Sequence, residues 1–373
     1  MPPYRKWKMR SGKYNEQIRE LLDRIRNLDI GNVRIMEVCG THTMAIAKSG
    51  IRQLLPENVH LVSGPGCPVC VTPAAVTDRI LALSEDKNVI IASYGDMLRV
   101  PGSTPGDNLL RRRAKGARVE IVYSPMDALE IAQNNPGIEV VFLGAGFETT
   151  APGTAATILA AKEREIGNFS VLSMLKSVEP ALRALIQSEN FDVQGFLCPG
   201  HVATIIGESG FRFLADEYAM PSVISGFEAE DILASVYRLM RQIKEKRPMT
   251  ENTYSRAVSV GGNTAAMSMI RACFELRDDL WRGLGFIPMS GYGIKREFAD
   301  FDAEARFGIN YPESEASGAC RCGDIICGRM QPAECPLFSK ACTPENPVGP
   351  CMVSSEGACA AAYKYGGQYI WKK

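Results

Sequence analysis

The chain has 373 residues, of which 46% are hydrophobic and 23% are charged. This length and composition are typical of a soluble protein with two or three domains and ample cores. The 42 basic residues balance the 42 acidic ones, so no overall field points to nucleic acid or to an acidic surface. Polar residues follow the basic opening MPPYRKWKMR, and no apolar run reaches the roughly 18 residues of a membrane span. We therefore expect a cytoplasmic protein without a signal peptide that binds neither membrane nor nucleic acid.

The first predicted elements are a helix, a strand and a second helix. Apolar side chains recur at helical spacing over residues 14–28. We expect residues 1–30 to form an N-terminal helix that packs on the rest of the chain. An apolar strand follows over residues 33–38, and residues 45–55 again have a helical pattern.

The motif CGTHT lies between that strand and that helix and begins with Cys39. We expect Thr41 or Thr43 to cap the helix. Backbone N–H groups at a helix N-terminus lower the pKa of a thiol, and the carboxyl ends of strands are where open α/β sheets bind ligands. A buried structural cysteine would fit the same position, but the nearby His42, one of only 3 histidines, favours a functional Cys39.

Strands and helices then alternate, which predicts parallel α/β sheets. The predicted strands are residues 60–63, 88–93, 118–123, 138–143, 169–175, 194–197 and 221–225. The predicted helices are residues 72–83, 126–133, 152–164, 180–188 and 231–244. A turn-rich junction at residues 134–137 divides the series into two Rossmann-like domains, residues 31–136 and residues 137–262.

The regular alternation stops after residue 262. Residues 264–276 predict a helix, residues 283–292 a loop and residues 297–307 a short charged helix. The segment from Cys320 to Cys359 holds 7 of the 12 cysteines and has almost no apolar periodicity. We assign residues 263–373 to a third, irregular domain that needs a stabilising cross-link, either a disulfide or a bound metal.

Three kinds of cross-link could stabilise this segment: disulfides, a zinc ion or an iron–sulfur cluster. Disulfides are rare in the cytoplasm, and structural zinc normally uses cysteine pairs about two to four residues apart. One set of four cysteines stands out, with 14, 6 and 16 intervening residues: Cys320, Cys335, Cys342 and Cys359. These wide intervals favour a [4Fe–4S] cluster enclosed by loops, with zinc as the alternative.

A second thiol motif is CPVC, which places Cys67 and Cys70 in a Gly/Pro loop before a predicted helix. Such a pair either cycles between dithiol and disulfide or supplies half of a zinc site. No second CxxC completes a zinc site, although Cys39 and His42 could do so in principle. The motif therefore favours redox or metal chemistry over packing alone.

The run GAGFET at residues 144–149 is similar to a dinucleotide-binding fingerprint, but it is incomplete. It lacks the third glycine and the acidic residue about 20 positions further on. We expect a close-packed turn in which Thr149 or Thr150 caps the following helix. Cys198 and Cys273 are expected to be core thiols.

Together these motifs resemble the HypD family of maturation factors, which help to build the iron centre of [NiFe]-hydrogenases. The resemblance extends over essentially the whole chain. It is carried by CGTHT at residues 39–43, GPGCPVC at 64–70, GFETTAP at 146–152, CPGHV at 198–202 and the run from Cys342 through Cys359.

The resemblance implies two α/β domains that flank a cleft, and a C-terminal domain that holds a [4Fe–4S] cluster on the four cysteines named above. It also implies that Cys39 binds one iron together with a cysteine of the small chaperone HypC. That iron would collect two cyanides, supplied by HypE, and one carbon monoxide before transfer toward the hydrogenase large subunit. Thiolate suits such an iron as a soft donor, and His42 and Thr41 complete the expected site.

The same resemblance implies two redox pairs. Cys67 and Cys70 match a pair across the cleft, and Cys322 and Cys351 match a second pair near the cluster. The arrangement is similar to that of ferredoxin:thioredoxin reductase. An iron–sulfur thiol–disulfide reductase is therefore the alternative function, and a zinc-stapled interaction module is a third. Cys327 has no role that the resemblance supplies, and a monomer that binds partners transiently is expected.

Overall fold

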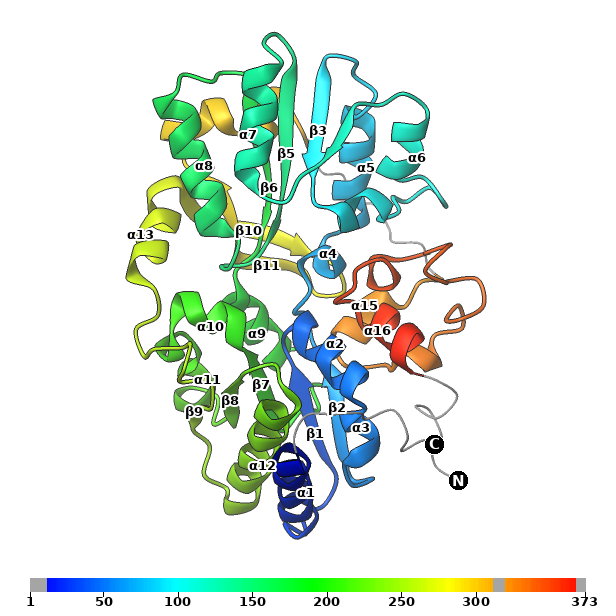
Figure 1. Ribbon diagram of the computed structural model, residues 1–373, viewed down its shortest axis with the longest axis vertical. Helices are drawn as coiled ribbons and strands as arrows, with labels where there is room; N and C mark the ends of the chain where they lie inside the picture. The colour runs from blue at the N-terminus through cyan, green and yellow to red at the C-terminus, as the bar shows by residue number, and fades with distance from the viewer. Residues whose placement is uncertain (1–11, 311–318, 367–373) are drawn as a thin grey trace.

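The structure is a computed structural model that describes residues 12–310 and 319–366. Two parallel β-sheets occupy opposite ends of the molecule, and the C-terminal segment lies beside their junction (Figure 1). The predicted α/β class with two parallel sheets is confirmed. Within the described ranges, no helix combines the length and the apolar character that a membrane span requires.

The first sheet has the strand order β2-β1-β7-β8-β9, and all neighbouring strands are parallel. Its strands are β1 (Val33–Glu37), β2 (Val59–Ser63), β7 (Gly195–Pro199), β8 (Ser222–Ser225) and β9 (Thr250–Asn252). The helices of this half are α1 (Gly12–Arg26), α2 (Gly40–Ser49), α3 (Ile51–Leu54), α10 (Gly200–Ile206), α11 (Phe213–Asp216) and α12 (Ala229–Glu245). The N-terminal helix α1 contacts α12, which in turn covers β7 and β8. The predicted N-terminal helix thus forms over Gly12–Arg26 and packs on this half, while residues 1–11 of the predicted segment lie outside the described residues.

The second sheet has the order β4-β3-β5-β6 and is also parallel throughout. Its strands are β3 (Val89–Ser93), β4 (Val119–Ile121), β5 (Glu139–Gly146) and β6 (Phe169–Leu175). The accompanying helices are α5 (Ala74–Leu83), α6 (Leu109–Ala114), α7 (Pro125–Asn134), α8 (Ala151–Glu163) and α9 (Val178–Ile186). β3 and β6 are buried along their whole length. Burial on both faces explains why such strands are continuous apolar runs in the sequence.

The predicted division at residue 136 is wrong, because the two sheets do not follow one another along the chain. β5 begins after that residue and yet pairs with β3, whereas β7 returns to pair with β1. One half therefore contains residues 33–63 and 195–252, and residues 89–175 form the other half between them. Local periodicity identifies strands but contains no information about which strands pair.

The predicted third domain from residue 263 is too long, because its first part belongs to the second half. α13 (Thr264–Cys273) packs against α8, and the hairpin of β10 (Phe274–Trp281) and β11 (Gly285–Ile294) contacts β6. The predicted loop at 283–292 is thus a strand, and the predicted helix ends at Cys273. Glycine, proline and serine in β11 are typical of loops, whereas pairing with β10 makes this stretch a strand. Residues 297–307 form two short helical turns, Arg296–Phe301 and α14 (Ala303–Phe307).

The cysteine-rich segment contains two short α-helices, α15 (Cys322–Ile326) and α16 (Ala358–Tyr365), and two 3-10 turns, Pro332–Glu334 and Pro350–Met352. α16 packs on α2, and α15 packs on α4 (Pro68–Val71), the short helix that carries the CPVC motif. One buried cluster includes Met36 of β1, Val141 of β5 and Cys351. One core cluster therefore connects the two sheets and the cysteine-rich segment, and each half has a further cluster of its own.

Candidate functional site

A cavity of about 210 Å³ lies where the carboxyl ends of the two sheets meet. Its lining includes Cys39, Thr41, Gly66, Pro68, Phe147, Thr149, Thr150, Val178, Pro199, His201 and Glu356. A larger hollow of about 540 Å³ shares Pro68, Thr150 and Glu356 with it, and the two therefore adjoin. Strand carboxyl ends from both sheets thus converge on one place, as expected for a ligand site in α/β folds.

Cys39 lies between β1 and α2, as predicted, and lines this cavity with a side chain that is 7% exposed. The N–H of Gly40 donates to the carbonyl of Gly66 at 3.2 Å. A Cβ atom on Gly66 would lie 2.4 Å from the backbone nitrogen of Cys39. Only glycine allows the loop that leads to the CPVC motif to approach Cys39 so closely.

The expectation that the helix N-terminus lowers the pKa of Cys39 is wrong. Burial and, second, the negative charge of Glu356 raise that pKa to about 11, and hydrogen bonding by the His42 backbone and by the side chain and backbone of Thr41 only partly opposes this. Desolvation of the thiolate outweighs the partial charges of the helix end. Cys39 is therefore a neutral thiol near pH 7 until a cation or an electrophile reaches it.

The predicted threonine cap of α2, at Thr41 or Thr43, is also wrong. Cys39 itself is the N-cap residue of α2, without a side-chain hydrogen bond. The hydroxyl of Thr41 donates instead to Glu356 Oε1 at 2.6 Å, and that of Thr43 donates to the Cys39 carbonyl at 3.3 Å. Thr150 does occupy the N-cap of α8, as predicted, although its side chain makes no capping hydrogen bond.

Glu356 is a site residue that sequence reasoning missed. It belongs to the run SSEGAC, three residues before Cys359, and no periodicity or spacing singles it out. The structure places its carboxylate against Thr41 and on the lining of both cavities. Only an unusual charge in an otherwise small-residue stretch between two cysteines could have drawn attention to it.

The structure places His201, rather than His42, on the cavity wall. His42 is fully buried, and its Nε2 donates to the Gly226 carbonyl at 2.9 Å. Burial lowers the pKa of His42 to about 4, so this ring is neutral. Phe227 packs against both rings, with centroids 4.7 Å from His42 and 4.0 Å from His201. His42 therefore supports the cavity from behind, and His201 faces it.

The CPVC motif lies at the junction of the two halves. Cys67 caps α4, and its sulfur accepts a hydrogen bond from the Cys70 N–H at 3.2 Å. Both thiols are buried, and Cys351 is an electrostatic neighbour of Cys70. Burial, together with the contacts to Cys351 and Cys67, holds the pKa of Cys70 well above its usual range.

Cys351 connects this motif to the cysteine-rich segment. Its sulfur lies 2.8 Å from that of Cys322, and Cys359 and Cys70 are its further electrostatic neighbours. The structure thus brings Cys322 and Cys351, the expected second pair, together. It also places Cys351 near Cys70, which the sequence did not predict. The thiols form a continuous chain from Cys67 through Cys70 and Cys351 to Cys322.

The four expected cluster ligands line one small cavity inside this segment. Its sulfur atoms come from Cys320, Cys335, Cys342, Cys359, Cys322 and Cys351, and its apolar wall includes Ile325, Leu337, Phe338 and Met352. A Cβ on Gly349 would lie 2.5 Å from the Cys320 sulfur, and the Val348 N–H donates to Cys342 Sγ at 3.4 Å. Backbone close to the sulfurs and N–H···S bonds are features of iron–sulfur sites.

The donor set can be tested against the groups that it could hold. Across residues 12–310 and 319–366, no three Cys, His, Asp or Glu side chains converge closely enough for a metal ion. Six cysteines and an apolar wall surround this one cavity, a donor set that suits a sulfur-rich group. The residues present therefore fit a cysteine-bound iron–sulfur cluster.

The remaining cysteines are buried away from both cavities. Cys198 and Cys273 have no exposed surface, which confirms their prediction as core thiols. Cys327 donates to the Gly283 carbonyl at 3.4 Å and lies under the β10–β11 turn. These three positions support packing rather than the site.

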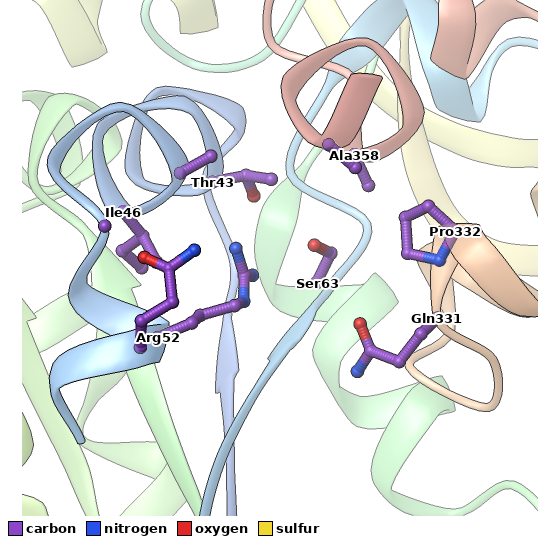
Figure 2. Close-up of a pocket in the computed structure, with 11 residues that line it drawn as sticks. Thr43, Ile46, Arg52, Ser63, Gln331, Pro332 and Ala358 are labelled. Carbon is purple, nitrogen blue, oxygen red and sulfur yellow. The ribbon is translucent and has the colours of Figure 1, made fainter. Parts of the chain in front are cut away.

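A buried ion pair anchors the strand that leads to Cys39. Glu37 at the end of β1 has no exposed surface, pairs with Arg52 and accepts a hydrogen bond from Ser63 Oγ at 3.1 Å. Figure 2 shows Arg52 and Ser63 in a narrow pocket between α2 and the cysteine-rich segment, opposite Gln331. Burial raises the pKa of Glu37, and the charge of Arg52 opposes this rise.

Fold and site together define a two-sheet α/β protein with one cysteine on the central cavity and a thiol-lined cavity beside it. The chain belongs to the HypD family, because the family model described as "HypD: Hydrogenase formation hypA family" matches residues 16–366. This confirms the resemblance seen in the motifs.

Curated relatives agree with this assignment. The chain is 47% identical over 340 residues to hydrogenase maturation factor HypD2 of Bradyrhizobium diazoefficiens, covering 89% of each chain. It is 46% identical over 338 residues to hydrogenase maturation factor HypD of Cupriavidus necator, again covering 89% of each. Against hydrogenase maturation factor HypD of Escherichia coli, identity is 43% over 351 residues and 94% of each chain.

Proposed function

We propose that this protein is a scaffold and redox factor for assembly of the Fe(CN)₂CO centre of [NiFe]-hydrogenases. The observation that carries the proposal is Cys39, a buried thiol on the wall of a cavity that receives strand ends from both sheets. Family membership supports hydrogenase maturation as the process, since the relatives are named as its factors.

In this proposal the iron is cargo that Cys39 holds together with a cysteine of HypC. The raised pKa of Cys39 keeps it protonated at rest, and binding of the cation displaces that proton. The cavity of about 210 Å³ has room for an iron with small diatomic ligands. His201 faces the same space and can donate a hydrogen bond to a cyanide nitrogen. The adjoining hollow of about 540 Å³ leaves access for segments of HypC and HypE.

We further propose that Cys320, Cys335, Cys342 and Cys359 hold a [4Fe–4S] cluster, which would supply single electrons when bound. The sulfur donors, the apolar wall and the close backbone support this assignment. A cytoplasmic location is part of the proposal, because free thiols persist in that compartment.

The thiol chain suits exchange between the two pairs. A Cys70 thiolate that attacks a Cys322–Cys351 disulfide at Cys351 forms a Cys70–Cys351 bond and releases Cys322 as a thiol. Attack by Cys67 on Cys70 then forms the Cys67–Cys70 disulfide and releases Cys351. Two electrons and two protons thus pass from the Cys67/Cys70 pair to the Cys322/Cys351 pair, and the reverse sequence of steps returns them. The contact between Cys70 and Cys351 supports this route.

The two alternative functions are less well supported. A thiol–disulfide reductase would use the same thiol chain, but it gives no role to Cys39, which lines the central cavity. Family membership also favours maturation over that activity. A zinc-stapled module gives no role to Cys39 or to the buried CPVC motif.

Infrared spectroscopy tests the proposal directly. The full chain is purified anaerobically together with HypC, and the region of metal-bound cyanide and carbonyl stretching is recorded. We expect bands for both ligands in the wild type and their loss in Cys39→Ala, which also abolishes hydrogenase maturation in cells. Absence of bands from the wild type, or maturation that persists in Cys39→Ala, would show that the proposed function is wrong.

A further inference from the structure

Glu356 lies at the point where the two sheets and the cysteine-rich segment meet. Its Oε1 accepts the Thr41 hydroxyl at 2.6 Å, which ties it to the first turn of α2 in one half. One residue earlier, the N–H of Ser355 donates to Asp96 Oδ2 at 3.3 Å, which ties the same loop to the other half. The loop thus links the segment beside the junction in Figure 1 to both sheets.

The approach of Glu356 to α2 requires the glycine that follows Cys39. A Cβ atom on Gly40 would lie 2.4 Å from the Glu356 Cβ and 2.8 Å from its carbonyl oxygen. Any larger residue at position 40 would push Glu356 away from Thr41. The contact between Glu356 and Thr41 therefore depends on glycine at position 40.

The loop that carries Glu356 is also held in place by its packing against Cys351. A Cβ on Gly357 would lie 2.2 Å from the Cys351 carbonyl oxygen, so residue 357 packs directly on the backbone of that cysteine. The Glu356 N–H donates to Ser354 Oγ at 3.3 Å. Because residue 357 packs on Cys351 and Glu356 is bonded within the same turn, a shift of Cys351 or of the start of α16 would move Glu356 with it.

We propose that Glu356 is a positioning residue that acts through Thr41 on Cys39. Its carboxylate holds the first turn of α2, and with it the Cys39 thiol, in the orientation that faces the cavity. Any rearrangement at Cys351 is transmitted to Cys39 by this contact. The inference rests on the proposed function of Cys39 but concerns a residue outside both predicted thiol pairs. A hydroxyl–carboxylate bond of this length is charge-assisted and roughly twice as strong as a neutral one.

Alkylation of Cys39 provides a readout that does not depend on bound iron. The reduced full-length protein is treated anaerobically with iodoacetamide, and the rate for each cysteine is measured by peptide mass spectrometry. We expect Thr41→Val to accelerate alkylation of Cys39 by about tenfold, the effect of one lost charge-assisted hydrogen bond. Glu356→Ala should accelerate it further, because this change also removes the negative charge that disfavours the Cys39 thiolate. The double variant should match Glu356→Ala, because the contact with Thr41 is already lost there. Thr41→Ser, which keeps the hydroxyl, should restore most of the wild-type rate.

Two controls separate positioning from general loosening. Glu345→Ala removes an exposed carboxylate from the same segment and should leave the Cys39 rate unchanged. Cys198 has no exposed surface and should stay unmodified in every variant that is folded. Glu356→Gln keeps a hydrogen-bond acceptor without the charge, so its effect should be smaller than that of Glu356→Ala.

The inference is refuted if Thr41→Val stays within about twofold of the wild-type rate, or if the two single effects multiply in the double variant. A parallel assay of hydrogenase maturation in cells separates this result from the proposed function. Loss of maturation in Cys39→Ala but not in Glu356→Ala would refute the positioning role alone. Maturation that survives Cys39→Ala would refute the proposed function, whatever the alkylation rates show.

Discussion

Removal of Arg52 should expose how strongly the end of β1 depends on one buried charge. Glu37 has no exposed surface, and its Oε1 is held by Arg52 and Ser63, whereas its Oε2 has no hydrogen-bond partner among the described residues. In Arg52→Met the carboxylate would lose its counter-charge without gaining water. Loss of one partner of a buried ion pair costs about 3–5 kcal/mol. Because the Arg52 side chain is 21% exposed, we expect the lower end, about 3 kcal/mol.

The pH dependence of this loss has a definite sign. Burial already raises the pKa of Glu37 above the unfolded value of 4.5, and the charge of Arg52 restrains that rise. Without Arg52 the folded-state pKa rises further, so the folded variant binds a proton that the unfolded chain does not. The stability of the variant relative to wild type should therefore increase as the pH falls toward 4.5. At pH 8 the deficit should be largest.

Urea denaturation of the full chain at pH 8 and pH 5.5 measures both effects. The matched control is the double variant Glu37→Gln/Arg52→Met, which removes the buried charge together with its partner and should recover most of the lost stability. A loss below about 1 kcal/mol in Arg52→Met would contradict the reasoning, since that is the range of a surface ion pair. A deficit that is the same at both pH values would contradict the assigned role of Glu37.

Four further predictions follow from the site. Gly66→Ala should reduce hydrogenase maturation at least about tenfold, because the added Cβ would displace the loop that packs against Cys39. Gly153→Ala is the control, since its added Cβ meets nothing within 4 Å and maturation should be unchanged. Equal effects of the two substitutions would exclude the close approach as the cause. Cys351→Ser should prevent transfer of a disulfide between the two thiol pairs, as mapped by mass spectrometry after mild oxidation; unchanged transfer would exclude the route through Cys351. His201→Gln should weaken the cyanide-band intensity without lowering the midpoint of thermal unfolding, because its ring lies on the cavity wall; a fall in stability alone would assign it to packing. Anaerobic protein should contain about four irons and four sulfides per chain, and one zinc without iron would contradict the cluster.

Much of the fold was accessible from local pattern. The buried runs of the two parallel sheets have near-continuous apolar sequences, so strands such as β3 and β6 were identified with nearly correct bounds. β11 was missed, because its glycines and proline are typical of loops and its pairing with β10 is a tertiary interaction. The order of the strands was not accessible either, since pairing of β1 with β7 joins residues about 160 positions apart.

By itself, the sequence determined the chemistry that is available: Cys39 at a strand end, the CPVC loop, the set of widely spaced cysteines, and membership of one family. Residue type and spacing can be read directly from the sequence, so these features needed no structure. Only the tertiary structure decided which groups meet. It placed His201 rather than His42 on the cavity, joined Cys70 to Cys351, and set Glu356 against Thr41. It also reversed the expected shift of the Cys39 pKa, because burial depends on everything that packs around the thiol and not on the helix that follows it.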